Sequence, residues 1–194
     1  MAETPSSMLP LGTKATHFEL DNIHTCGTRK VSTAQLMGSK GMMLAFICNH
    51  CPYVLAIAHA LGEFSRDYCN SGIGLAVINA NDVSRYPADS ADNMLRFAAQ
   101  NNFAMPYLYD EDQSVARAYH AACTPDFYLF DKNMELVYRG QFDDTRPGNN
   151  IPSSGVDIRA ACDAVLAGRD VNKHQVASIG CSIKWLPENE LNKD

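Results

Sequence analysis

Two cysteines separated by two residues are the clearest chemical signal in the sequence. Cys48 and Cys51 enclose Asn49 and His50, and Pro52 follows directly. Thiols at this spacing can form a disulfide and exchange it with a substrate, because one thiolate attacks and the other resolves the mixed disulfide. A structural zinc site would need a second pair of ligands at similar spacing, which the sequence does not contain. The pair therefore favours redox chemistry without a metal or another cofactor.

The two cysteines lie where a strand is expected to pass into a helix. The apolar run at residues 42–47 is typical of a buried central strand. Proline is favoured in the first turn of a helix, and apolar residues then recur at helical spacing, so the sequence predicts a helix over residues 52–68. Cys51 would lie at or beside the helix N-cap. Free backbone N–H groups and the positive end of the helix dipole lower the pKa of a thiol in that position.

Turn signals divide the rest of the chain into alternating strands and helices. Strands are expected at residues 17–20, 29–31, 73–79, 127–130 and 135–139. Helices are expected at residues 88–102, 113–121 and 155–166. The strands on either side of the helix at 52–68 should be parallel, whereas the first two and the last two should form hairpins. The order predicts one α/β domain with a central mixed sheet flanked by helices, an N-terminal β-hairpin, a polar tail at 1–12 and a C-terminal extension at 169–194.

Composition and charge exclude several classes of protein. The chain has 194 residues, of which 46% are hydrophobic, and its formal net charge is −6. These values suit one domain with a sizeable core and not a protein that binds nucleic acid through a basic face. The N-terminus lacks the pattern of a secretory signal, the run at 42–48 is too short to span a bilayer, and seven cysteines without framework spacing argue against a secreted disulfide scaffold. We therefore expect a cytoplasmic protein that binds neither nucleic acid nor membranes.

Several short segments, spread over most of the chain, match one known pattern. They are residues 18–21, 46–54, 106–110, 116–119, 124–131 and 138–140. Together they resemble the thioredoxin-like superfamily, in particular a peroxiredoxin-like (alkyl hydroperoxide reductase/thiol-specific antioxidant) subgroup with a Cys-x-x-Cys motif. The resemblance implies a thioredoxin-like fold and an antioxidant or thiol redox activity. It also implies that Thr124 and Pro125 form a loop against the redox cysteines, with a cis peptide bond before the proline.

The resemblance leaves two assignments for the attacking thiol. In the thioredoxin register Cys48 attacks and Cys51 resolves. In the peroxiredoxin register Cys51 and Pro52 match the Cys-Pro of that family, so Cys51 attacks. We prefer Cys51, because a cysteine at the N-cap gains more from the helix dipole than one three residues earlier. His50 is either a surface residue of the loop before the helix or a group that changes the charge of the thiolate.

The sequence differs from both peroxiredoxins and thioredoxins at positions near the cysteines and in the loop at Pro125. Cys48 and Pro125 stand where peroxiredoxins carry a hydroxyl residue and an arginine, so peroxidase activity should be weak. Thioredoxins keep a buried carboxylate about six residues before the cysteine pair. Met42 and Ala45 occupy those positions here, which leaves the proton transfer without an acidic residue close in sequence.

Two further cysteines lie near features of the resemblance. Cys123 precedes Pro125 by two residues and could face the redox pair, but we expect it to be a buried, inert thiol. Cys181 lies in residues 179–185, which contain the only Trp of the chain and resemble a tail motif of the subgroup. Two alternatives stay open for Cys181: a third redox or docking thiol, or a packed residue of a C-terminal strand.

The preferred function is a thiol-disulfide oxidoreductase that uses the Cys48/Cys51 pair. The alternatives are a thiol peroxidase that uses Cys51 and a non-enzymatic binding module with a thioredoxin fold. The expected partners are protein or small-molecule disulfides, peroxides in the second case, and a thiol reductant such as thioredoxin or glutathione.

Overall fold

A mixed sheet of seven strands forms the centre of the molecule in the computed structural model, which describes residues 3–24 and 29–190. From one edge to the other the strands are β3 (Lys30–Ser32), β2 (Glu19–Asn22), β6 (Tyr107–Tyr109), β5 (Ile73–Asn79), β4 (Gly41–Phe46), β8 (Asp126–Asp131) and β9 (Leu136–Gly140). Strands β4, β5 and β6 are parallel, and the remaining pairs are antiparallel. Parallel strands β4 and β5 and both hairpins confirm the predicted mixed α/β sheet.

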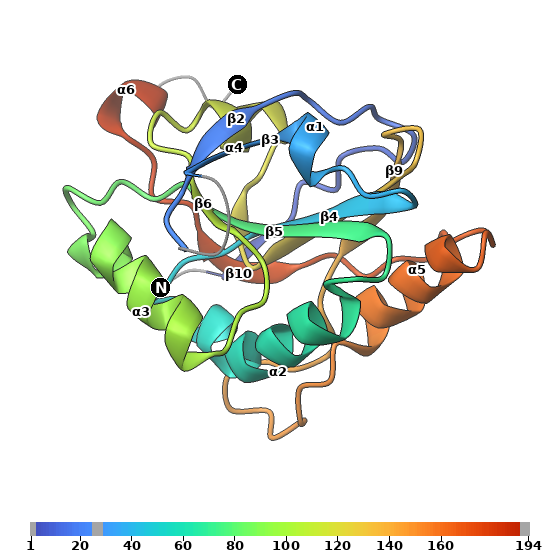
Figure 1. Cartoon of the computed structure of the whole chain (residues 1–194). Helices are drawn as coiled ribbons and strands as arrows, with labels where there is room; N and C mark the ends of the chain where they lie inside the picture. Colours follow the sequence, from blue (N-terminus) through green and yellow to red (C-terminus); the bar gives the residue numbers. More distant parts are fainter. Residues whose placement is uncertain (1–2, 25–28, 191–194) are drawn as a thin grey trace.

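Helices cover both faces of this sheet (Figure 1). On one face lie α2 (Pro52–Tyr68), α3 (Ala91–Gln100) and α5 (Val156–Leu166). On the other face lie the short helices α1 (Thr33–Leu36) and α4 (Ser114–Ala118). The 3-10 turn η1 (Pro87–Asp89) precedes α3, and α6 (Pro187–Glu190) lies near the C-terminus.

Strand β4 is buried on both faces because it lies between β5 and β8 and under both layers of helices. Met43 and Ala45 pack into the core that contains α2, whereas Leu44 and Phe46 pack into the core on the opposite face. All four side chains are completely buried. This environment explains the uninterrupted apolar run, and it fixes the end of β4 just before the two cysteines.

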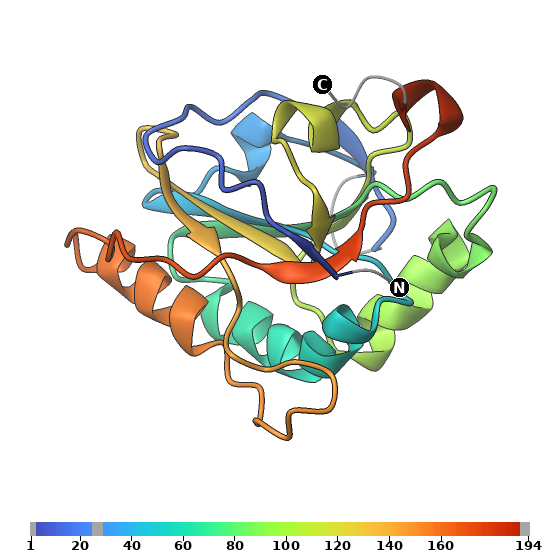
Figure 2. The same ribbon diagram turned by 180° about the vertical axis from the view of Figure 1, so that it is seen from behind.

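A second, smaller sheet joins the two ends of the chain. It contains β1 (Glu3–Pro5), β10 (Ile179–Ser182) and β7 (Cys123–Thr124), in that order and all antiparallel. Figure 2 shows β10 and β1 side by side. The expected polar tail at 1–12 therefore contains a strand, and the C-terminal extension at 169–194 contains both β10 and α6.

Several other boundaries differ from the prediction. The helix expected at 88–102 is divided into η1 and the shorter α3, and the helix expected at 113–121 is reduced to α4. Strand β6 was not predicted. The expected turn of the first hairpin includes residues 25–28, which lie outside the described residues.

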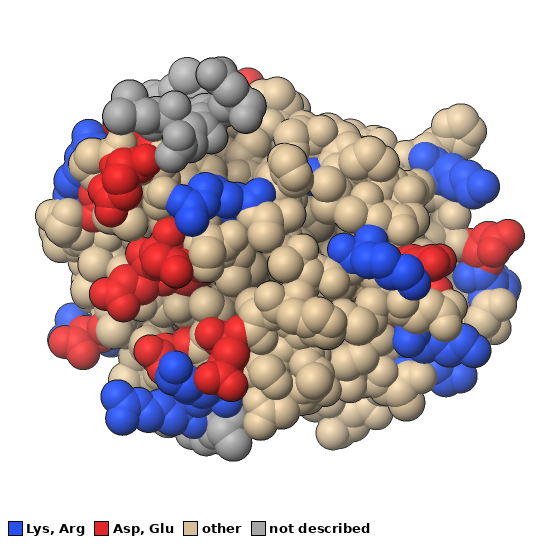
Figure 3. Space-filling model, turned by 90° about the horizontal axis from the view of Figure 1, so that it is seen from above, with Lys and Arg blue, Asp and Glu red and all other residues tan. Residues whose placement is uncertain are grey.

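Among residues 3–24 and 29–190, no helix has the length and hydropathy required to cross a membrane. Figure 3 shows one face of the molecule, on which acidic and basic side chains are interspersed rather than gathered into one basic patch.

Candidate active site

The N-cap of α2 and the loop before it hold the two thiols of the Cys-x-x-Cys pair. Cys51 is the N-cap residue, with φ −70° and ψ 123°, and Pro52 occupies the first turn, as predicted. The Cys51 carbonyl accepts the first helical hydrogen bond, from the Leu55 N–H at 2.9 Å. Cys48 and Cys51 are 1% and 0% exposed, so neither sulfur lies open to solvent.

The loop at Thr124 and Pro125 lies directly against the two sulfurs. The peptide bond between these residues is cis, as the resemblance implied. Cys48 Sγ lies 3.4 Å from Thr124 Oγ1, and the Cys51 thiol donates to the Thr124 carbonyl at 3.1 Å. The structure therefore brings together four residues that the sequence singled out. Thr124 lies more than 70 positions after both Cys48 and Cys51 in the chain.

A third sulfur completes the cluster. Cys181 Sγ lies 2.8 Å from Cys51 Sγ, and Cys181 is 3% exposed. The residue belongs to β10, where it pairs with Thr124 of β7. Of the two alternatives left open for Cys181, the packed position in a C-terminal strand is observed, and that position also brings its sulfur to the Cys-x-x-Cys pair.

The electrostatic environment separates the three thiols. The pKa of Cys51 is lowered to about 5, first by a hydrogen bond from the Cys48 thiol and further by the Cys181 thiol and the backbone N–H of Val54. Burial acts in the opposite direction, and the Thr124 carbonyl also favours the neutral thiol that donates to it. The pKa of Cys48 is raised by its hydrogen bond to Cys51 and by burial, and burial raises the pKa of Cys181 to about 12. Cys51 is thus the thiol that most readily ionises.

Cys123 lies beside the same loop but is hydrogen-bonded to Pro125 and, among the described residues, not to another thiol. It is completely buried in β7, and its thiol donates to the Pro125 carbonyl at 3.7 Å. Burial raises its pKa well above the ordinary value of a thiol. The environment is that of the inert thiol expected from the sequence.

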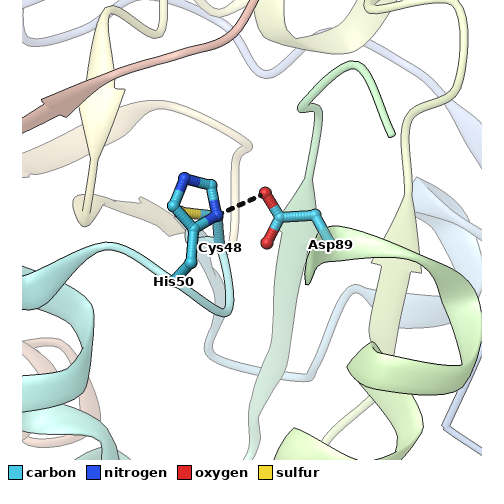
Figure 4. Close-up of side chains that lie close together, drawn as sticks. All are labelled: Cys48, His50 and Asp89. Carbon is cyan, nitrogen blue, oxygen red and sulfur yellow. Dashed lines mark ion pairs between the residues drawn. The ribbon is translucent and has the colours of Figure 1, made fainter. Parts of the chain in front are cut away.

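A buried carboxylate lies beside Cys48, from a part of the chain that the sequence did not point to. Asp89, at the end of η1, is completely buried, and its Oδ2 lies 2.9 Å from His50 Nδ1 (Figure 4). The His50 ring stacks on Tyr86 with 5.8 Å between centroids and 5° between planes. The side chain of His50 is only 24% exposed, so it is oriented by two neighbours rather than free at the surface.

The same three residues are close enough to be considered as metal ligands. One ligand atom each from Cys48, His50 and Asp89 lies within 4.8 Å of the other two. The carboxylate of Asp89, however, already accepts from the Asn49 N–H at 2.7 Å and from Asn81 Nδ2 at 2.7 Å, in addition to its contact with His50. With its oxygens occupied in this way, Asp89 fits the role of a group that orients His50 better than that of a metal ligand.

Asp89 could not be found from the sequence because no motif marks it. It lies 40 residues after Asn49. Only the return of the chain from β5 through η1 brings it to the start of α2. Asn49 is held in the same network, since its side chain accepts from Tyr107 Oη at 3.0 Å and donates to the Ala88 carbonyl at 3.0 Å.

Comparison with protein families matches most of the chain to one family. Residues 11–139 match the model of the AhpC/TSA family. The chain belongs to the AhpC/TSA family. This range includes the Cys-x-x-Cys pair and the loop at Thr124 and Pro125, whereas β1 and β10 lie outside it. A search of curated proteins found no match.

Solved structures similar to this AhpC/TSA protein include two with high sequence identity. An uncharacterized conserved protein from Geobacillus kaustophilus is 48% identical, with a TM-score of 0.92 over 96% of this chain and 98% of that chain. A hypothetical protein from Sinorhizobium meliloti 1021 is 44% identical, with a TM-score of 0.90 over 95% of this chain and 99% of that chain. A putative thiol:disulfide interchange protein DsbE from Chlorobium tepidum shares the fold at 20% identity, with a TM-score of 0.62 over 81% of this chain and 99% of that chain. The fold is therefore thioredoxin-like, within a redox family.

Proposed function

We propose that the protein is a thiol-disulfide oxidoreductase in which Cys51 attacks a substrate disulfide and Cys48 resolves the intermediate. The observation that carries the proposal is the position of Cys51, at the N-terminus of α2, with its pKa lowered to about 5 and the Cys48 thiol hydrogen-bonded to it. A thiolate at neutral pH is the reactive form in disulfide exchange.

The geometry supports a two-step exchange. The Cys51 thiolate attacks one sulfur of the substrate disulfide, a mixed disulfide forms, and the first substrate thiolate leaves. The Cys48 thiolate then attacks Cys51 Sγ, which forms the Cys48–Cys51 disulfide and releases the second substrate thiol. The substrate is reduced by two electrons and the pair is oxidised by two. In this proposal His50, which contacts Asp89 and has a ring nitrogen within 4.8 Å of Cys48 Sγ, takes the proton that Cys48 loses.

Reduction of insulin disulfides by dithiothreitol tests this function. We expect wild type to accelerate the reaction, Cys51→Ser to lose at least tenfold, and Cys48→Ser combined with Cys181→Ser to accumulate a mixed disulfide with substrate. Cys69→Ser removes an exposed thiol at the other end of α2 and is the matched control. Activity of Cys51→Ser equal to that of wild type would exclude the proposed role. Oxidised glutathione as a second substrate distinguishes a preference for small disulfides from a preference for protein disulfides.

Replacement of the buried carboxylate tests the proton transfer. We expect Asp89→Asn to slow resolution of the mixed disulfide about tenfold or more, because His50 loses the partner that orients it. The charge of Asp89 also raises the pKa of Cys48, so loss of that charge alone would make resolution faster. Rapid quenching of the mixed disulfide measures the step, and Asp92→Asn, in the exposed first turn of α3, is the control. Faster resolution in Asp89→Asn would contradict the role in proton transfer.

A thiol peroxidase is the second candidate, favoured by membership of the AhpC/TSA family and by the Cys51-Pro52 dipeptide. Pro125, which follows the Thr124 that contacts both thiols, stands where an arginine would be needed to stabilise the departing hydroxide. The buried Arg139 is bound to Asp126 instead. We therefore expect slow peroxide reduction. Stopped-flow measurement of hydrogen peroxide loss against the reduced protein tests this candidate, and a rate constant no greater than that of free cysteine excludes it.

A further inference from the structure

The small sheet that joins the chain ends lies over the redox pair and fixes the position of Cys181. In β10, Cys181 pairs with Glu3 of β1 on one side and with Thr124 of β7 on the other. Its sulfur lies 2.8 Å from Cys51 Sγ. Backbone pairing of Cys181 with a strand on each side therefore holds the third sulfur at the site.

The residue before Cys181 shows how closely β10 approaches the loop. At Gly180 a Cβ atom would lie 1.9 Å from the Thr124 carbonyl oxygen and 3.2 Å from Pro125 Cδ. A side chain here would move the strand away, so glycine is required for the observed approach. The position of Cys181 thus depends on contacts between β10 and the loop beside the thiols.

Cys51 is the central sulfur of the three. In its thiolate form it accepts hydrogen bonds from both the Cys48 thiol and the Cys181 thiol, which lower its pKa. A disulfide bond is about 2.05 Å long, so Cys51 and Cys181 need to approach each other by less than about 1 Å to form one. Two partners for a disulfide therefore lie at Cys51: Cys48, at Cys-x-x-Cys spacing, and Cys181, whose sulfur is already in contact.

We propose that Cys181 is a third redox thiol that takes over the disulfide bond of Cys51 from Cys48. This inference rests on the proposed function, because that reaction leaves Cys51 bonded to Cys48. The Cys181 thiolate attacks Cys51 Sγ, the Cys51–Cys181 bond forms and the Cys48–Cys51 bond breaks. The electron pair stays on Cys48, which takes up the proton that Cys181 lost. One disulfide replaces another, so the exchange consumes no oxidant.

The exchange has a structural consequence for the site. It returns Cys48 to the thiol form beside His50 and Asp89, and it joins α2 covalently to β10. The oxidised protein should therefore contain two disulfide isomers in equilibrium.

Disulfide mapping of the full chain tests the inference. The protein is oxidised with oxidised glutathione, free thiols are blocked with N-ethylmaleimide at acidic pH, and peptic peptides are identified by mass spectrometry. We expect the peptide pair linked through Cys51 and Cys181 in wild type, and at least a fivefold increase of this pair in Cys48→Ser or Cys48→Ala. Cys69→Ser should leave its amount unchanged, since Cys69 lies at the far end of α2. Gly180→Ala should lower its amount several-fold without lowering that of the Cys48–Cys51 pair.

The outcomes separate this inference from the proposed function. A Cys48–Cys51 peptide together with insulin reduction, but no Cys51–Cys181 peptide in wild type or in either Cys48 variant, overturns the role of Cys181 and leaves the oxidoreductase intact. No disulfide at Cys51 and no insulin reduction overturns both. Circular dichroism of each variant confirms that it is folded before mapping.

Discussion

Iodoacetamide is expected to modify Cys51 with a rate that reaches half of its maximum near pH 5. The pKa of this thiol is lowered to about 5. An ordinary thiol has a pKa of about 8.5, so at pH 6 the thiolate fraction of Cys51 should be roughly 300 times that of an ordinary cysteine. The rate should therefore be nearly constant from pH 6 upward. Mass spectrometry of the Cys51 peptide after timed alkylation measures this profile.

The chain supplies its own controls for this experiment. Cys48, whose pKa is raised, should react little below pH 9, and Cys69, which is exposed, reports the alkylation of an accessible thiol in the same sample. A Cys51 midpoint above pH 8 would contradict the assignment of the nucleophile, and a low midpoint at Cys48 would reverse it. The midpoint is independent of the slow absolute rate that burial of Cys51 causes.

The same shift makes folding stability depend on pH. Because the pKa of Cys51 is lower in the folded state than in the unfolded state, ionisation contributes stability that is fully present above the unfolded pKa and is lost as the pH falls toward 5. The difference in unfolding free energy between wild type and Cys51→Ser should therefore increase between pH 5 and pH 9.

Replacement of Arg139 by methionine is expected to destabilise the fold by about 3–5 kcal/mol. Arg139 and Asp126 are both completely buried, with 3.0 Å between Arg139 Nη2 and Asp126 Oδ2. The same nitrogen donates to Ser7 Oγ and to the His120 carbonyl, and the guanidinium lies 4.6 Å from the centroid of the Tyr128 ring. Without Arg139 the carboxylate stays buried without its counter-charge. Urea unfolding measures the loss.

Two variants make this expectation specific. Arg139→Met combined with Asp126→Asn should recover part of the lost stability, because burial already raises the pKa of Asp126 and the amide carries no charge. Lys14→Met breaks the exposed pair between Lys14 and Glu135 and should cost less than about 1 kcal/mol. Equal losses for Arg139→Met and Lys14→Met would contradict the role of the buried pair.

The elements that hold the Cys-x-x-Cys pair could be predicted because their signals are local. The apolar run before Cys48 gave β4 to within one residue, and apolar spacing after Pro52 gave the observed bounds of α2. The same reasoning gave β5. These elements are long, and their buried side chains repeat with the period of the structure that they form.

The small sheet could not be predicted, because its strands have two to four residues and little apolar pattern. They are stable only through pairing with strands far away in the sequence, such as Glu3 with Cys181. Asp89 was not predicted for a similar reason, since its contact with His50 forms only when the chain folds. Thr124, Pro125 and Cys181 were identified from the resemblance, but the contact of Cys181 with Cys51 was not.

The two sulfurs of the 2.8 Å contact lie 130 positions apart in the chain. A bond between Cys51 and Cys181 would turn most of the polypeptide into a covalent ring, whereas a bond between Cys48 and Cys51 closes only a small loop. After boiling in detergent without reductant, the ring form would stay compact and migrate ahead of the linear form on a gel. The mobility of the band would then show whether Cys51 is bonded to Cys48 or to Cys181.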